Sequence, residues 1–194
     1  MALDTYFSIA QPTEALFKEK GSKFIAFAYP VENEQEIRDR LELVRKKYYD
    51  ASHHCYAYML GKDKKDFRAN DDGEPSGTAG LPILGQLKSK NITNVLVVVV
   101  RYFGGTKLGA SGLVSAYKTA AAEALAQATI VEKILVQSIT FYFEYLQMNE
   151  VMKLIKEYGL KILSQHFDNQ CQITLQIRED LVAEVQKKME ALIN

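Results

Sequence analysis

The sequence predicts an α+β protein of two domains, and three patterns lead to that prediction. A continuous apolar run around Val95 to Val100 is typical of a central, fully buried strand. The alanine-rich segment over residues 109–128 has strong helix propensity. Beyond residue 136 the chain changes to short elements in the order strand, helix, strand, strand, helix. We therefore expect domains at residues 1–132 and 136–194.

The first domain should open with a β-hairpin followed by a helix. Three apolar patterns predict short strands, over residues 6–9, 15–18 and 23–29. Gly21 lies in the turn between the last two, where a positive φ costs it little. Asn33 and Glu36 have the spacing of a helix N-terminus, and the basic residues 45–47 suit the negative end of the helix dipole. The buried face of this helix should carry Ile37, Leu41 and Val44.

The middle of the first domain alternates buried elements with polar connections. Residues 53–60 predict a strand, whereas residues 61–74 are too polar and charged for a buried element and predict a long surface loop. Ser76 is placed to cap a helix that runs through about residue 88. A central strand within residues 92–103 then leads into the alanine-rich helix. That helix repeats large or small apolar residues every fourth position, at Leu113, Tyr117, Ala121 and Leu125.

The second domain resembles an incomplete ferredoxin-like α/β plait. Its strands are predicted over residues 138–144, 160–167 and 171–177. Its helices are predicted over residues 148–158 and 180–192. The resulting order, βαββα, is that of the plait without its last strand.

Composition restricts the kinds of partner and compartment. The 24 basic and 24 acidic residues give a formal net charge of +0, so nucleic acid could be attracted only by a local patch. The two cysteines, Cys55 and Cys171, are far apart and lack metal-ligand spacing, which favours a reducing compartment. The N-terminus lacks a signal-peptide pattern and no apolar run is long enough to cross a bilayer. We expect a cytoplasmic protein with no membrane partner and no cofactor.

The first segment that could carry chemistry is the glycine-rich run from Asp71 to Pro82, Asp-Asp-Gly-Glu-Pro-Ser-Gly-Thr-Ala-Gly-Leu-Pro. Its hydroxyls and backbone N–H groups could bind an anion, at Ser76, Gly77 and Thr78. Its carboxylates could instead hold a hydrated divalent cation that bridges to phosphate, at Asp71, Asp72 and Glu74. A solvated turn that caps the following helix is the third interpretation.

The second segment is Val100-Arg-Tyr-Phe-Gly-Gly-Thr-Lys-Leu-Gly-Ala-Ser-Gly112, between the buried strand and the alanine-rich helix. It matches neither a Walker loop nor the dinucleotide fingerprint, because Ala110-Ser111 follows Gly109 and the glycine spacing differs. Two cations, Arg101 and Lys107, could bind an anion. Backbone access would come from Gly104, Gly105 and Gly109. Tyr102 and Phe103 could stack on a base or pack, and the whole segment could also be a tight turn.

Two further segments are weaker candidates. Strand alternation places His53 with Cys55 on one face and His54 on the other. A Cys/His nucleophilic pair is conceivable, but no orienting acid lies nearby in sequence, so we interpret His53 as a ligand contact or a structural histidine. The run Gly61-Lys-Asp-Lys-Lys-Asp-Phe-Arg68, with Lys88 and Lys90, has the basic character of a nucleic-acid footprint, although its aspartates weaken it. A solvated loop is the default interpretation of this run.

Three blocks together resemble the YigZ/IMPACT family. They are Ala51-Ser-His-His-Cys-Tyr-Ala-Tyr, Asp72-Gly-Glu-Pro-Ser-Gly-Thr-Ala-Gly-Leu-Pro-Ile-Leu and Val99-Val-Arg-Tyr-Phe-Gly-Gly-Thr-Lys-Leu-Gly-Ala-Ser-Gly-Leu-Val-Ser-Ala-Tyr117. The motifs cover roughly the first 130 residues, and the remainder is similar to the small C-terminal domain of the bacterial branch. One departure is Ala110-Ser111, where many relatives have other small residues, often glycine.

The resemblance implies a first domain of the two-layer βαβ kind seen in elongation factor G and a ribosomal protein, and a second domain like another plait of that factor. It implies contact with RNA or the ribosome and leaves room for a protein partner. Eukaryotic members regulate translation by interfering with activation of an initiation-factor kinase, a pathway that bacteria lack. No established catalytic residues come with the family.

Two hypotheses follow. The leading one is a non-enzymatic, translation- or ribosome-associated protein that binds RNA or another phosphate-rich partner through Arg101, Lys107 and the two glycine-rich loops. The alternative is a magnesium-dependent enzyme acting on a phosphorylated small molecule, with the carboxylates of the first loop holding the metal.

Overall fold

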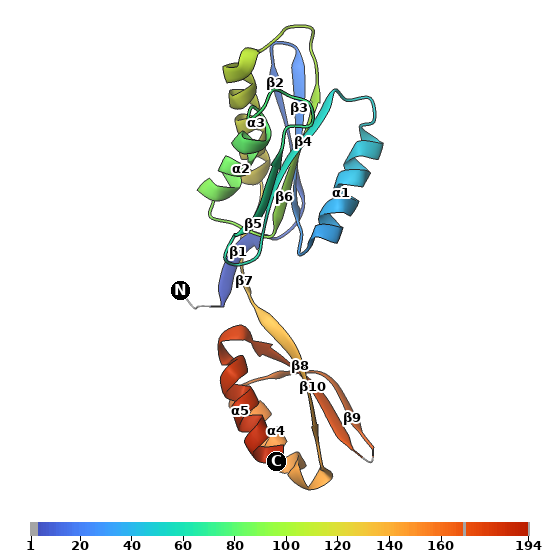
Figure 1. Ribbon diagram of the computed structural model, residues 1–194, viewed down its shortest axis with the longest axis vertical. Helices are drawn as coiled ribbons and strands as arrows, with labels where there is room; N and C mark the ends of the chain where they lie inside the picture. Colours follow the sequence, from blue (N-terminus) through green and yellow to red (C-terminus); the bar gives the residue numbers. More distant parts are fainter. Residues whose placement is uncertain (1–3, 169, 194) are drawn as a thin grey trace. The chain divides into compact units, whose positions relative to one another are not determined.

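The chain forms two compact units, which are shown in the computed structural model of Figure 1; the structure describes residues 4–168 and 170–193. One unit spans Tyr6–Lys133, and the other takes the chain from Ile134 onward together with Asp4 and Thr5. Both units mix helices and strands, which confirms the α+β class. We keep residues 1–132 and 136–194 as the proposed domain limits.

The unit Tyr6–Lys133 is built on a five-stranded antiparallel sheet. Its strands, in spatial order, are β2 (Thr13–Glu19), β3 (Ser22–Pro30), β6 (Val95–Tyr102), β4 (His53–Leu60) and β5 (Asp66–Asn70). The apolar run that predicted a central strand is β6, and every residue from Val95 to Val100 is fully buried. A separate two-stranded sheet pairs β1 (Thr5–Ile9) with β7 (Ile130–Ile134).

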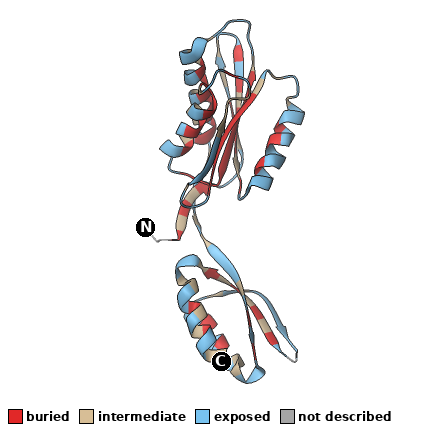
Figure 2. Cartoon of the chain, in the orientation of Figure 1, coloured by how far each residue is buried: buried red, intermediate tan, exposed pale blue. Residues whose placement is uncertain are grey.

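Helices cover both faces of this sheet. Helix α1 (Glu34–Lys47) lies on one face, and α2 (Gly80–Ser89) and α3 (Gly109–Ala126) lie on the other (Figure 1). The core under α1 and the core under α2 and α3 are separate, and Figure 2 shows buried positions concentrated along the strands between them. The unit therefore has three layers, and the expected two-layer arrangement is corrected in this respect.

The predicted hairpin and first helix are confirmed. Lys20 and Gly21 both have positive φ, 45° and 80°, and connect β2 to β3 in a two-residue turn. The Asn33 side chain accepts a hydrogen bond of 2.9 Å from the backbone N–H of Glu36 at the start of α1. The buried residues of α1 are Ile37, Leu41 and Val44.

Two expectations for residues 61–76 are wrong. The segment contains the edge strand β5, which pairs with β4, because its polar side chains remain exposed while its backbone satisfies the sheet. Glu74 is buried rather than solvated. Ser76 is exposed and lies before the helix, whose N-cap is Ala79 without a side-chain hydrogen bond.

The second unit contains the predicted βαββα order. Its elements are β8 (Val136–Phe143), α4 (Met148–Glu157), β9 (Lys161–Phe167), β10 (Cys171–Arg178) and α5 (Val182–Ile193), with short 3-10 turns at Tyr145–Gln147 and Glu179–Leu181. The antiparallel sheet has the order β8-β10-β9, and its core joins one sheet face to α4 and α5. This is a ferredoxin-like plait of three strands. Nowhere in residues 4–168 and 170–193 is a helix long and apolar enough to span a membrane.

A close backbone approach fixes the end of β6 against the β2–β3 hairpin. A Cβ atom on Gly104 would lie 1.9 Å from the carbonyl carbon of Gly21 and 2.2 Å from the backbone nitrogen of Ser22. Both distances are far below van der Waals contact, and both neighbours are backbone atoms. Only glycine is compatible with this contact.

We therefore expect Gly104→Ala to destabilise the protein by about 2 kcal/mol or more, because the hairpin and the loop would have to separate. The measurement is chemical denaturation. The control is Gly85→Ala in α2, where a Cβ atom meets nothing within 4 Å and should stabilise the helix by about 0.5 kcal/mol. Equal effects of the two substitutions would contradict the close approach.

Candidate functional site

A buried ion pair joins the end of the central strand to the first glycine-rich loop. Arg101, near the end of β6, donates through Nη1 to Oε1 of Glu74 over 2.6 Å, and the two side chains are only 7% and 4% exposed. The same carboxylate oxygen accepts a 2.8 Å hydrogen bond from the hydroxyl of Tyr117 on α3. Strand, loop and helix therefore converge on one carboxylate.

Two aromatic rings lie beside the Arg101 guanidinium. Its central carbon lies 5.5 Å from the ring centroid of Phe24 and 5.6 Å from that of Phe103. Its Nη2 is 3.5 Å from the hydroxyl of Ser22, while its buried Nε has no hydrogen-bond partner within the part of the chain that the structure describes. Because Glu74 already offsets its charge, Arg101 is not a free cation for an anionic ligand.

Asp71 organises the first glycine-rich loop. Its carboxylate accepts backbone hydrogen bonds of 2.8 Å from Gly77, 3.0 Å from Ala79 and 2.8 Å from Gly80, so it performs the capping role predicted for Ser76. Burial raises the pKa of Asp71, but these N–H donors outweigh burial and hold the pKa below its usual value. The loop is thus folded around a carboxylate rather than around an external ligand.

Asp72 attaches the same loop to β4. Its carboxylate accepts a 2.6 Å hydrogen bond from the backbone N–H of His54, and its carbonyl lies 2.8 Å from Nδ1 of His53. A carbonyl can only accept, so Nδ1 of His53 carries the proton. Nε2 of His53 lies 3.8 Å from Oε1 of Glu74, which places this histidine beside the buried ion pair.

Cys55 is not a catalytic nucleophile in this arrangement. It is fully buried, and its sulfur lies 3.3 Å from the hydroxyl of Tyr117 and 3.0 Å from the carbonyl of Asp71. Burial raises the pKa of the Cys55 thiol, so the thiol stays protonated at neutral pH. The conceivable Cys/His pair is therefore replaced by a structural network.

The two glycine-rich loops meet at a cavity of about 430 Å³. The lining residues come from the end of the first loop, the end of β6 and the start of α3: Glu74, Pro75, Arg101, Phe103, Lys107, Leu108, Gly109, Ala110 and Leu113. Lys107 is exposed, and Phe103 is 50% exposed. The cavity therefore combines an accessible cation, an accessible aromatic ring and the N-terminus of a helix.

The start of α3 lines this cavity and carries no capping side chain. Its N-cap, Leu108, makes no side-chain hydrogen bond, and its first turn contains no acidic residue. Gly105 and Gly109 have φ values of 85° and 74°, and a Cβ atom on either would meet nothing within 4 Å. Open backbone N–H groups at a helix N-terminus suit an anion.

Only part of the predicted site lies at the cavity. Four predicted residues line it, namely Glu74, Arg101, Lys107 and Gly109. The remaining predicted residues are not among its lining: His53, Asp71, Asp72, Ser76, Gly77, Thr78, Gly104 and Gly105. Sequence reasoning missed Pro75, Leu108 and Leu113 as lining residues, and the available signal was that Leu108 and Leu113 adjoin glycines while Pro75 lies two residues from Gly73 and Gly77. Gly104 is required by packing against Gly21 rather than by a ligand.

The three carboxylates of the first loop do not form a cation site. Asp71 accepts backbone donors, Asp72 accepts from His54, and Glu74 is paired with Arg101. Among residues 4–168 and 170–193, no group of three or more His, Cys, Asp or Glu side chains could hold a metal ion. The magnesium alternative therefore lacks the ligand set that it needs.

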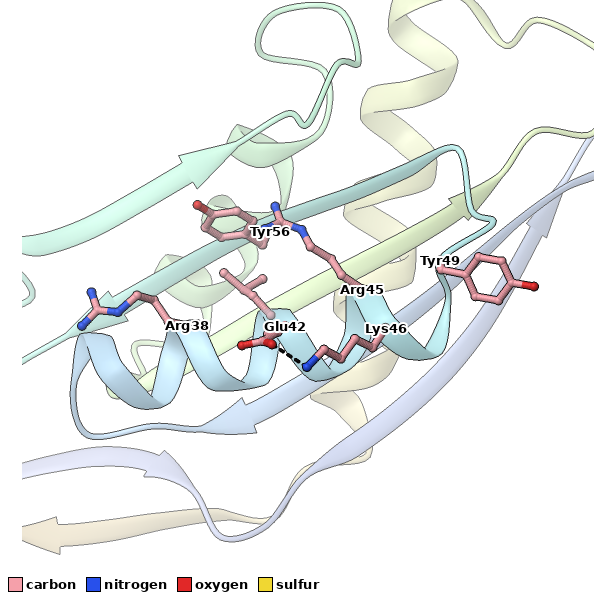
Figure 3. A pocket seen from close by; sticks show the side chains of 7 residues that line it. Arg38, Glu42, Arg45, Lys46, Tyr49 and Tyr56 are labelled. Atoms are coloured by element: carbon pink, nitrogen blue, oxygen red, sulfur yellow. Dashed lines mark ion pairs between the residues drawn. The ribbon is translucent and has the colours of Figure 1, made fainter.

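A second hollow, of about 540 Å³, lies on the α1 face of the sheet (Figure 3). In that view Arg45 extends from α1 toward Tyr56, Tyr49 points away, and an ion pair of 2.5 Å joins Lys46 to Glu42. This hollow is larger, and it touches the first glycine-rich loop only through Arg45, whose Nη2 lies 3.9 Å from the carboxylate of Asp72. We favour the smaller cavity because its cation and backbone donors point to one class of ligand.

The predicted basic footprint at residues 61–68 is a turn and the strand β5. Lys64 has a φ of 57° and donates to the carbonyl of Asn91 over 2.9 Å, while Lys65 pairs with Asp63. Lys88 lies 4.8 Å from the ring centroid of Phe67. These contacts engage Lys64, Lys65 and Lys88 within the protein, and the segment is a turn and an edge strand rather than the solvated loop that the sequence predicted.

Replacing Glu74 should destabilise the protein, because Arg101 would stay buried without its ion-pair partner. Glu74→Gln leaves the Arg101 charge without an opposite charge, so we expect the free energy of unfolding to fall by about 3 kcal/mol. Chemical denaturation measures this. The double variant Arg101→Met/Glu74→Gln removes both charges and should be more stable than Glu74→Gln alone. A Glu74→Gln variant as stable as the native protein would contradict the buried pair.

Replacing Asp71 should change how stability depends on pH. The lowered pKa of Asp71 means that its contribution is present above its unfolded pKa and is lost as pH falls through the folded pKa. At neutral pH we expect Asp71→Asn to be less stable by about 1 kcal/mol, and the gap should narrow below about pH 4. Thermal denaturation across this range is the measurement. The control is Ser76→Ala, at the exposed position that the sequence predicts as the cap, and it should change stability little. A larger loss of stability in Ser76→Ala than in Asp71→Asn would contradict the capping role of Asp71.

Comparison with known proteins extends over both units of the chain. The family model for the Impact N-terminal domain matches residues 20–125. The chain is 33% identical over 177 residues to the IMPACT family member YvyE of Bacillus subtilis, covering 91% of this chain and 82% of that protein. It is 32% identical over 189 residues to the IMPACT family member YigZ of Escherichia coli, covering 96% and 93%.

A solved structure has the same architecture. It is described as the crystal structure of a hypothetical protein, is 31% identical in sequence, and aligns with a TM-score of 0.75 over 97% of this chain and 93% of its own. The glycine-rich blocks that form the cavity lie inside the matched family domain. This chain belongs to the IMPACT family, because the family model matches its first unit and IMPACT family members align with most of the chain.

Proposed function

We propose that this protein is a non-enzymatic, translation-associated regulatory protein that binds RNA or another phosphate-rich partner at the cavity between its two glycine-rich loops. The observation that carries the proposal is the position of Lys107. Its exposed ammonium group lines the same cavity as the uncapped start of α3. A phosphate there would receive both a positive charge and backbone N–H donors.

The roles that we assign to the cavity residues favour binding over catalysis. The Arg101–Glu74 pair is neutral as a unit and holds the two loops together. Lys107 then supplies the charge, and the half-exposed ring of Phe103 supplies a flat apolar surface on which a base can stack. Charge with stacking is the combination that single-stranded nucleic acid requires.

Membership of the IMPACT family connects this proposal to translation. The family resemblance implies that eukaryotic members act as translational regulators, and it implies contact with RNA or the ribosome for modules of this kind. We propose a cytoplasmic location, because ribosomes are found there. The reducing conditions of the cytoplasm also agree with the two buried free cysteines.

The test measures retention of ribosomes and total RNA by the purified protein at low and high salt. We expect salt-sensitive retention that Lys107→Ala weakens, with the slope of log K against log salt reduced by about 1 for the lost phosphate contact. The control is Lys118→Ala, which removes an exposed lysine of α3 outside the cavity, whereas Lys107 lies in the loop just before that helix. Arg101 is unsuitable for this test because its removal would disturb the buried pair.

Two results would contradict the proposal. Retention that does not change with salt would exclude a phosphate-dominated contact. Equal losses in Lys107→Ala and Lys118→Ala would mean that the cavity is not the binding surface. A thermal shift with a phosphorylated metabolite and Mg²⁺, without RNA retention, would direct the work to the enzyme alternative.

A further inference from the structure

The outer edge of β8 is unpaired in the second unit. The sheet order β8-β10-β9 makes β8 an end strand, and among residues 4–168 and 170–193 no strand pairs on its far side. In a complete ferredoxin-like plait a fourth strand would lie beside this first strand. Eight residues of β8, Val136–Phe143, therefore present one row of backbone N–H and C=O groups without a strand partner.

The composition of β8 differs from that of the other end strands. Edge strands ordinarily carry charged residues, irregularities or proline, which prevent pairing with another chain. Charged residues are present in β2 (Glu14, Lys18, Glu19), in β5 (Asp66, Arg68) and in β9 (Lys161). The ladder of β9 also shifts register opposite Thr174 and Leu175. In contrast, β8 reads Val-Gln-Ser-Ile-Thr-Phe-Tyr-Phe and has no charge and no proline.

The β8 edge is also accessible and strongly β-forming. Val136 is 43% exposed and Tyr142 is 52% exposed, and six of the eight residues are β-branched or aromatic. The uncharged β1 is not comparable, since it is shorter and Phe7 already accepts a hydrogen bond from the backbone N–H of Thr93. Among the end strands of the two larger sheets, β8 is the one without protection against pairing.

We propose that β8 pairs with β8 of a second copy of this chain, which joins two plaits into one continuous sheet. We argue for a second copy because the β8 strands of two copies match each other in charge and in which residues lie on each face of the sheet. An antiparallel pairing centred on Thr140 places Ile139 opposite Phe141 on the helix-covered face, twice by symmetry. On the open face it places Tyr142 opposite Ser138. No charged residues of β8 face each other, whereas the same symmetric pairing of β2 or β5 would include charged side chains.

The size of the contact predicts a weak dimer. A single strand pair is smaller than a standard interface of about 1,600 Å², so we expect association that depends on protein concentration rather than a permanent complex. The helices of both copies lie on the same side of the joined sheet, because a two-fold axis through Thr140 is perpendicular to it.

The test is sedimentation equilibrium of the full chain over about a hundredfold range of protein concentration. We expect a reversible monomer–dimer equilibrium for the native protein. Thr140→Lys should raise the dimer dissociation constant at least about tenfold, because two like charges would face each other at the symmetry axis.

The matched control is Thr174→Lys on the central strand β10. The hydroxyls of Thr140 and Thr174 are hydrogen-bonded to each other over 2.9 Å, so both variants lose the same bond and place a lysine on the same face. Only Thr140→Lys puts that lysine on the free edge. We expect Thr174→Lys to change the dissociation constant less than about twofold.

Hydrogen exchange of the native protein provides a readout that needs no variant. Backbone amides of β8 should become more protected as protein concentration rises, while those of β5 should not. A protein that stays monomeric over the whole range would overturn the proposal. So would a dimer that Thr140→Lys and Thr174→Lys weaken equally, or one whose formation leaves β8 exchange unchanged.

Discussion

The ion pair between Arg101 and Glu74 brings together segments that are far apart in the sequence. Through it the end of β6 contacts the first glycine-rich loop, and Tyr117 adds α3 to the same carboxylate. Ser22 and Phe24 bring the β2–β3 hairpin to the guanidinium. A buried charge that lost its partner would cost several kilocalories per mole, so each segment is held in place by the need to keep this pair complete. The cavity between the loops exists because the loops cannot separate.

This constraint assigns different roles to residues that look alike in sequence. Arg101 and Lys107 are both cations near glycines, but burial gives the first a structural partner and leaves the second exposed. Asp71 and Glu74 are both carboxylates of one loop, yet one receives backbone N–H groups and the other receives a guanidinium. The ligand binding that we propose therefore uses the residues that the network does not engage, chiefly Lys107 and the start of α3.

Much of the fold could be predicted from local pattern, and the failures have a common cause. The central strand, α1, α3 and the βαββα order of the second unit follow from periodicity and capping signals that act over a few residues. Strand β5 and the burial of Glu74 could not be predicted, because they depend on pairing with β4 and on Arg101, which lies 27 residues further along the chain. The sequence places the candidate site on these two loops for the same local reason, but which of its residues line the cavity depends on tertiary contacts. Gly104 illustrates the difference, since its requirement for glycine comes from Gly21 across the sheet.

The most direct test of this account is to map the RNA contact on isotope-labelled protein by nuclear magnetic resonance. Amide signals would be followed while a short single-stranded RNA is added, and the shifts compared between the cavity and the hollow beside α1. The account predicts that the largest shifts fall on Lys107, Gly109 and Ala110, with the α1 signals nearly unchanged. Shifts concentrated on Arg38, Arg45 and Tyr49, or no shifts in either region, would contradict it.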